Sequence, residues 1–383
     1  MSLSSSPADH QPKHRQVFDE LRREIASGKY LAGQKLPSEA DLVRRFGASR
    51  ITVGRAVRDL QQQGFVERRA GSGTYIRTSD SSAQPSGLSF GLLIPDLGRT
   101  DIFEPICQGM TDAPGAAGHV LIWGNTSQLH ESSATRQAQA LQLCQQYISR
   151  RVAGVFFAPI ESLPAEDATN HQIATALQSA GIPLVLLDRD YLPYPQRSPY
   201  DVVGIANRSA GFIPTQHLLD LGSRRIVFFS YPHTVATVDE RIAGYRDALY
   251  LHGLPVDPAF VQHLRADDVE SIKNLLETLR PDAFVCANDR TAGRLMQSLL
   301  SLGMRIPQEI RIVGIDDIAY ASLLPVPLTT VHQPCREIGI AAMSTMLERI
   351  ARPSMAVRNV LLETTLVVRD SCGAKVATHR RKI

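Results

Sequence analysis

The sequence is poor in cysteine and has no long apolar run. Its five cysteines among 383 residues are scattered and form no C-x-x-C or Cys/His pairing, which argues against a disulfide framework and a zinc site. No stretch approaches the roughly 18 apolar residues of a membrane span, and the first fourteen residues, MSLSSSPADHQPKH, lack the apolar core of a signal peptide. We therefore expect a soluble cytoplasmic protein with no metal, no cofactor and no membrane partner.

The motifs of common enzyme classes are missing as well. The first candidate strand-to-helix junction, IPDLGRTDIF, has no G-x-G-x-x-G fingerprint for a dinucleotide. No G-x-S-x-G elbow, H-E-x-x-H pair or Walker loop occurs elsewhere. We expect that the protein is not an enzyme, and we predict no catalytic residue.

Charge is unevenly divided along the chain. Residues 1–80 hold fourteen Lys and Arg against nine Asp and Glu, a net charge of +5, whereas the remaining residues have a net charge of −2. The length and the 43% hydrophobic content allow two or three domains with a sizeable core. A small basic module joined to a large near-neutral one fits a polyanion-binding domain with a separate cargo domain, although a solvated basic face without a partner has the same charge pattern.

Three helices and a hairpin are predicted in the basic module. The apolar spacing of HRQVFDELRREIASG gives an amphipathic helix that ends at Gly28, and LPSEADLVRRFG gives a short helix capped by Ser38 and ended by Gly47. In a third helix, capped by Ser49, the apolar stripe is Val53, Ala56, Val57 and Leu60, and another side carries Arg50, Gly54 and Arg58. FVERR and TYI around the glycine-rich AGSG predict a β-hairpin.

This order of elements is typical of a winged helix-turn-helix, in which the N-terminal end of the capped helix enters a DNA major groove. KYLAGQKLPSEADLVRRFGASRITVGRAVRDLQQQGFVERRAGSGTYI resembles the DNA-binding domain of the GntR family of bacterial transcription regulators over residues 13–78. The resemblance implies double-stranded operator DNA as a partner. The predicted DNA contacts are Ser38, Ser49, Arg50, Thr52, Arg55, Arg69, Gly71, Ser72, Gly73 and Thr74.

Two positions depart from the family pattern. Arginine usually follows the T-V pair, but this chain has Gly54 there and its arginine one step later at Arg55. Ala40 stands where a polar residue is common. We therefore do not infer the operator sequence from relatives. Gly54 either permits a closer approach of the helix to DNA or is simply tolerated at an exposed site.

A large α/β region follows a short join. We predict a disordered tail at 1–12, a linker at 79–87 and a C-terminal tail at 373–383, because these stretches are polar and lack periodicity. Between linker and tail, apolar strand-like runs alternate with helical segments, which predicts parallel sheets with a ligand at the carboxyl ends of the strands. The runs are SFGLLIPDL, HVLIWGNTS, VAGVFFAPI, IPLVLLDRD, DVVGIAN, RIVFFSYP, DAFVCAND and RIVGIDD.

These runs, together with DERIAGYRDAL and LTTVHQP, resemble the effector domain of LacI-type repressors, a relative of periplasmic sugar-binding proteins. The resemblance spans 88–372 and implies two discontinuous lobes, roughly 88–203 with 333–357 and 204–332 with 358–370. It also implies a ligand between the lobes and a side-by-side dimer. The predicted ligand contacts are Phe103, Asp188, Arg241, Asn288, Asp316 and Gln333.

Several of these assignments have a competing interpretation. The Asp and Arg positions also fit structural ion pairs at strand ends, and Trp123 fits either a ligand contact or the core. Asp289 is expected to cap the helix that follows it. Carboxylate, guanidinium and amide groups suit a sugar. Because the first loop has Thr100-Asp101-Ile102-Phe103 in place of the usual Asn-Pro-Phe-Phe, a purine or a phosphorylated sugar stays an alternative.

The two resemblances together predict a regulator that binds operator DNA as a dimer and changes its DNA affinity when a sugar binds. Repression of carbohydrate-utilisation genes is the family-based expectation. The linker stretch TSDSSAQPSG has no apolar wedge for the minor groove, so kinking of DNA by intercalation is not expected. A solute-binding protein would need export, and an enzyme would need a catalytic constellation; both are weaker hypotheses.

Overall fold

The chain forms two compact units, Met1–Ser86 and Gly87–Ile383. A computed structural model describes residues 13–26, 29–30, 33–62, 65–69, 72–76, 87–94, 101–124, 133–160, 168–232 and 236–374. The predicted tail at 1–12, Gly28, Gly71 and all but the last residue of the predicted linker lie outside these residues.

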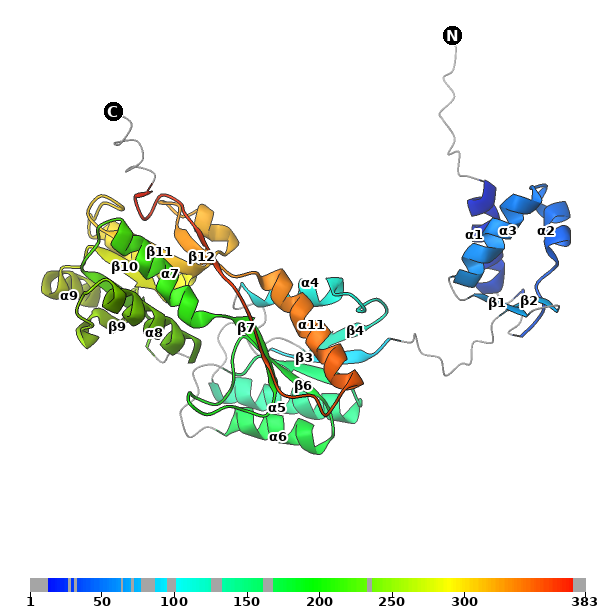
Figure 1. Ribbon diagram of the computed structural model, residues 1–383, viewed down its shortest axis with the longest axis horizontal. Coiled ribbons are helices and arrows are strands. Elements are labelled where there is room, and N and C mark those ends of the chain that lie inside the picture. Colours follow the sequence, from blue (N-terminus) through cyan, green and yellow to red (C-terminus); the bar gives the residue numbers. More distant parts are fainter. Residues whose placement is uncertain are drawn as a thin grey trace, which may run out of the picture. The chain divides into compact units, whose positions relative to one another are not determined.

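The first unit is a three-helix bundle with a two-stranded hairpin (Figure 1). Its elements are α1 (Lys13–Ala26), α2 (Glu39–Phe46), α3 (Arg50–Gln62), β1 (Val66–Arg69) and β2 (Gly73–Ile76). The predicted apolar stripe of α3 is confirmed, because all four of its residues are buried against Leu21 of α1 and Leu42 of α2. An ion pair between Arg45 and Glu24 joins α2 to α1 as well.

Helix α2 begins and ends as its sequence predicts. The Ser38 side chain accepts a hydrogen bond from the Asp41 backbone N–H. Gly47 has φ of 52°, a left-handed conformation that costs glycine little and ends the helix. The turn between α2 and α3 is thereby fixed, and with it the direction of α3.

The second unit consists of two lobes, each built on a six-stranded sheet (Figure 1). The first sheet has the order β13-β7-β6-β5-β3-β4 and the second β14-β12-β11-β10-β8-β9. All pairs are parallel except β12 with β14. The strands of the first sheet are β3 (Ser89–Leu93), β4 (Val120–Trp123), β5 (Gly154–Phe157), β6 (Leu184–Leu187), β7 (Asp201–Ile205) and β13 (Asn359–Leu362). Those of the second are β8 (Ile226–Ser230), β9 (Val261–His263), β10 (Ala283–Cys286), β11 (Arg311–Asp316), β12 (Thr329–His332) and β14 (Thr365–Val367).

Helices cover both faces of each sheet. In the first lobe α4 (Phe103–Asp112) and α11 (Cys335–Ala351) lie on one face, and α5 (Ser133–Ser149) and α6 (Thr169–Ser179) on the other (Figure 1). In the second lobe the corresponding pairs are α7 (Asn207–Asp220) with α8 (Ala236–Leu251), and α9 (Val269–Leu279) with α10 (Asp289–Ser301). Two short 3-10 turns, Pro258–Phe260 and Ala319–Ser322, complete the second lobe.

All eight predicted strands are present, but the lobe boundary near residue 358 is wrong. Strand β13 pairs with β7 in the first sheet, although its residues were predicted to belong to the second lobe. The chain therefore crosses between the lobes three times: from β7 to α7, from β12 to α11, and from β13 to β14. No helix in the described part of the chain is long and apolar enough to cross a bilayer.

Candidate DNA-binding surface and ligand site

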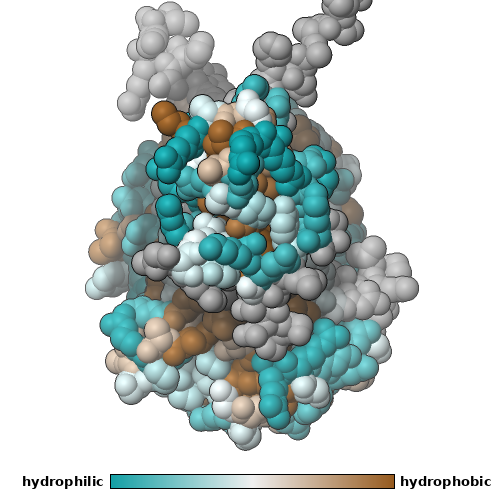
Figure 2. Space-filling view, turned by 90° about the vertical axis from the view of Figure 1, so that its right-hand side faces the viewer, coloured by the Kyte–Doolittle hydropathy of each residue, from teal (hydrophilic) through white to brown (hydrophobic). Residues whose placement is uncertain are grey.

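The outer face of α3 is basic and exposed. Arg50, Arg55 and Arg58 lie away from the buried stripe of the helix. Within the described residues, the guanidinium groups of Arg50 and Arg55 make no hydrogen bond or ion pair. Figure 2 looks onto the first unit, whose surface there is largely hydrophilic. A helix face with free guanidinium groups is suited to phosphates and to guanine edges.

Two of the predicted DNA-contacting hydroxyls, those of Ser38 and Ser49, also cap helices. Ser38 donates to the Asp41 carboxylate at 2.6 Å. Ser49 Oγ accepts from the Thr52 backbone N–H at 3.2 Å and lies 2.8 Å from Thr52 Oγ1. These residues therefore fix the start of each helix whether or not DNA is bound.

The hairpin formed by β1 and β2, which we call the wing, presents polar groups at its tip. Ser72 Oγ lies 2.7 Å from the Tyr75 hydroxyl, and Thr74 is partly exposed. Gly73 has φ of 124°, a backbone conformation that strongly favours glycine. The Arg69 backbone pairs with Gly73, whereas the Arg69 side chain and all of Gly71 lie outside what the structure describes.

In the second unit, polar residues follow the ends of strands from both sheets. Asp188 follows β6 of the first sheet and Asp316 ends β11 of the second. Both residues have positive φ angles, 70° and 122°, which are uncommon for residues other than glycine. Such strained backbone is concentrated at functional sites, where the surrounding structure holds it in place.

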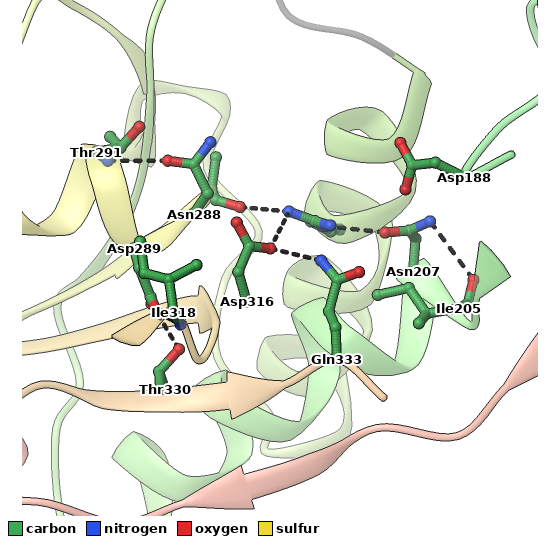
Figure 3. Close-up of polar contacts among 12 residues, drawn as sticks. Asp188, Ile205, Asn207, Asn288, Asp289, Thr291, Asp316, Ile318, Thr330 and Gln333 are labelled. Atoms are coloured by element: carbon green, nitrogen blue, oxygen red, sulfur yellow. Dashed lines mark hydrogen bonds and ion pairs between the residues drawn. The ribbon is translucent and has the colours of Figure 1, made fainter. Parts of the chain in front are cut away.

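Arg241 of α8 connects these strand ends. It is 5% exposed. Its Nε donates to Asn207 Oδ1 at 2.9 Å, and its Nη1 donates to the Ala287 carbonyl at 2.6 Å and lies 3.8 Å from Asp316 Oδ1. Gln333, which follows β12, donates from Nε2 to the same Asp316 oxygen (Figure 3). Three of the predicted ligand contacts are thus brought together by direct bonds.

The structure corrects the expected cap of helix α10. Asn288, not Asp289, caps α10, because its Oδ1 accepts from the Thr291 backbone N–H at 2.8 Å. Asp289 is fully buried and accepts from Thr330 Oγ1 and from the Ile318 backbone N–H (Figure 3). Asp289 therefore ties α10 to β12 and to the loop after β11.

Two further carboxylates, Asp188 and Asp101, also have cationic partners. Asp188 accepts from Arg189 at 2.7 Å, and Asp101 before α4 lies 3.5 Å from Arg290 of α10. Burial raises the pKa of Asp316 to about 7, with smaller raising effects of the Asp188 and Asp101 carboxylates and in spite of the lowering effects of Arg241 and Gln333. Burial also holds the pKa of Asp289 well above its usual range.

Two aromatic candidates occupy different environments. Phe103 is 2% exposed and belongs to the core of the first lobe, so its ring has no open face in this structure. Trp123 is 62% exposed at the end of the edge strand β4, which excludes the core interpretation.

Sequence reasoning missed Asn207, which orients Arg241 from the start of α7. The sequence did indicate this residue, because Asn207 directly follows the run DVVGIA. Several of the predicted site residues likewise come directly after an apolar run. Its role depends on a neighbour 34 positions away, which strand periodicity does not reveal.

The matches to known protein families agree with the division of the chain into two units. Residues 13–76 match the family of bacterial regulatory proteins of the gntR family, and residues 215–372 match the periplasmic binding protein-like domain. The chain is 27% identical over 369 residues to an arabinose metabolism transcriptional repressor of Geobacillus stearothermophilus, covering 94% of this chain and 97% of the relative.

Two solved structures share the fold. The transcription regulator GntR from Chromobacterium violaceum is 27% identical, with a TM-score of 0.59 over 74% of this chain and 99% of that one. A complex of the transcriptional regulator CelR with cellobiose is 24% identical, with a TM-score of 0.62 over 85% of this chain and 91% of that one.

Proposed function

Because the chain joins a gntR-family regulatory domain to a periplasmic binding protein-like domain, we propose that it is a ligand-responsive transcription regulator that represses carbohydrate-utilisation genes in the cytoplasm. The observation that carries the proposal is the pairing, in one chain, of an exposed basic helix in a winged helix-turn-helix with a polar cluster at the strand ends of two parallel sheets. The relatives named above are transcription regulators or repressors. A protein that acts by binding DNA and a ligand, without catalysing a reaction, agrees with the functions of these relatives.

We assign operator binding to α3 and the wing, and ligand binding to Asp188, Arg241, Asn288, Asp316 and Gln333, with Asn207 and Asp289 as supporting residues. Asp188 follows a strand of the first sheet and Asp316 ends a strand of the second, yet the charge of Asp188 acts on the pKa of Asp316. A ligand that hydrogen-bonds to both would therefore contact both lobes. Such a ligand favours the arrangement of lobes in which both contacts are made.

A neutral polyhydroxyl compound fits this cluster better than a phosphorylated one. Arg189 and Arg290 face carboxylates, and Arg241 faces a carbonyl, an amide oxygen and a carboxylate. A phosphate would have to displace one of these acceptors, whereas sugar hydroxyls can donate to the carboxylates. The cellobiose bound by CelR and the arabinose-metabolism role of the Geobacillus repressor support a sugar.

We further propose that the working form is a dimer. Two copies joined through their second units would offer two recognition helices to two half-sites of an operator. The second helix would bind at a high effective concentration once the first is bound. A ligand that moves one lobe against the other would then change the spacing of the helices and weaken operator binding.

The first experiment is a thermal-shift screen of the full chain against pentoses, hexoses, disaccharides, sugar phosphates and purines. A ligand that binds only the folded state raises the melting temperature by mass action, and we expect the shift from a neutral sugar. Asp188→Ala should abolish it. Val256→Ala, at an exposed position of the same unit, is the matched control and should keep it.

The same ligand must also act on DNA binding. Operator sequences are first selected from random duplex DNA with the full chain, and affinity is measured by fluorescence anisotropy with and without the sugar. We expect the sugar to weaken binding at least fivefold, within the usual range of allosteric coupling. A sugar that shifts the melting temperature but leaves operator affinity unchanged would refute the coupling.

A further inference from the structure

The exposed face of α3 carries one apolar side chain among its arginines. Ile51, in the first turn of the helix, is 82% exposed. It lies opposite the buried stripe of Val53, Ala56, Val57 and Leu60, because at about 100° per residue these positions are turned roughly 140–240° away from it. Gly54, Arg55 and Arg58 fall on the same side as Ile51.

Among the described residues of the first unit, no contact accounts for Gly54. A Cβ added at this position would meet only Glu39 Oε2, at 3.9 Å, and its φ is not in the left-handed range. Alanine would therefore fit and would favour the helix. The space that glycine leaves open lies on the surface one turn after Ile51, and Arg58 donates from Nε to the Gly54 carbonyl at 3.3 Å, which holds that arginine along the helix.

We propose that Ile51 and Gly54 form an apolar surface that recognises a thymine methyl group in the operator. This inference rests on the proposed function of α3 as the helix that enters the major groove. In that groove only an A·T pair presents a methyl group, and apolar side chains are the groups that read it. Arg50 and Arg55 beside the surface would set the register through phosphates or guanine, and Ile51 would add specificity at the thymine position.

The test uses the full chain and its selected operator. Each consensus thymine is replaced in turn by deoxyuridine, which removes the methyl group and nothing else. For the native chain we expect one position per half-site at which affinity falls about fourfold, the effect of exposing one buried methyl group. Ile51→Ala should bind the thymine operator correspondingly more weakly and show no further loss at that position.

Gly54→Ala supplies a second, independent measurement. The added methyl group should raise the melting temperature of the first unit, because alanine favours a helix over glycine, and it should lower operator affinity by filling the space next to Ile51. Val256→Ala in the second unit serves again as control, with unchanged affinity and an unchanged deoxyuridine effect.

The outcomes separate this inference from the proposed function. If no deoxyuridine weakens binding, or if Ile51→Ala retains the full deoxyuridine effect, thymine recognition by Ile51 is overturned while operator binding stands. If Gly54→Ala binds as tightly as the native chain, the role of the glycine in this surface is overturned. If no sequence is selected from random DNA, the proposed function fails, and the inference fails with it.

Discussion

Asp316 links the stability of the second unit to pH. Its pKa in the folded chain is raised to about 7 by burial, above the value of about 4 for an exposed carboxyl. A raised acid pKa means that the folded state holds the proton more tightly. Stability is therefore full below about pH 4 and falls as the pH rises through 7. Between pH 5 and pH 8 we expect a loss on the order of 2 kcal/mol from this group.

The measurement is equilibrium unfolding of the ligand-free chain at pH 5 and pH 8. Trp123 is the only tryptophan of the chain and lies in the second unit, so its fluorescence reports that unit alone. Asp316→Asn should flatten the dependence, and Asp267→Asn, at an exposed ion pair, should not. An equally steep dependence in Asp316→Asn would show that another group, such as buried Asp289, is responsible.

At the residue scale, the sequence predicts where polar groups gather better than it predicts what each one does. Asp188, Asp316 and Asn288 lie at strand ends as expected. The assignment of the helix cap to Asp289 failed by one position, because Asn288 and Asp289 are both good caps and the distant Thr330 binds the Asp289 carboxylate in the interior. A contact between two residues 41 positions apart produces no periodic pattern in the sequence.

At the scale of helices and strands, two helix pairs approach closely through glycine. A Cβ on Gly211 of α7 would lie 1.9 Å from the Arg241 carbonyl of α8, and one on Gly109 of α4 would lie 1.9 Å from the Arg336 carbonyl of α11. In each pair, one helix follows a crossover between the lobes. The other helix either carries Arg241 or follows Asp101, whose charge acts on the pKa of Asp316. The glycines therefore allow each helix that follows a crossover to pack closely against the helix that positions Arg241 or Asp101.

We predict that Gly211→Ala destabilises the second unit by about 2–3 kcal/mol, because α8 must move away to admit the methyl group, and that it weakens sugar binding by displacing Arg241. Gly293→Ala is the matched control in another helix of the same lobe. Its Cβ would meet only side-chain atoms, the nearest at 3.3 Å, so unfolding should change little. Equal stability of the two variants in urea titrations would refute the backbone contact.

The central strands β5, β6, β8 and β10 could be predicted from sequence because they are buried on both faces, and their apolar runs are nearly continuous. Strands β9, β13 and β14 could not, since each is a three- or four-residue edge strand with partly exposed residues. The lobe to which β13 belongs depends on its pairing with β7, which lies far earlier in the chain.

At the scale of the whole molecule, the basic first unit should make operator binding strongly dependent on salt. Each phosphate contact adds about −0.9 to the slope of log affinity against log salt. If Arg55 contacts the DNA backbone in both subunits of a dimer, Arg55→Gln should reduce the steepness by about two. Arg150→Gln, at an exposed position of the second unit, should not change it. An unchanged slope in Arg55→Gln would remove this residue from the interface.

The three crossings between lobes have a consequence for synthesis on the ribosome. The last strand of the first sheet is β13 and that of the second is β14, separated by two residues near the end of the chain. Neither sheet is complete until these strands have left the exit tunnel, whereas the winged unit is complete after residue 76. A message truncated shortly before codon 359 would therefore yield a folded DNA-binding head on two unfinished lobes, a product that should lack both the response to sugar and the proposed dimer.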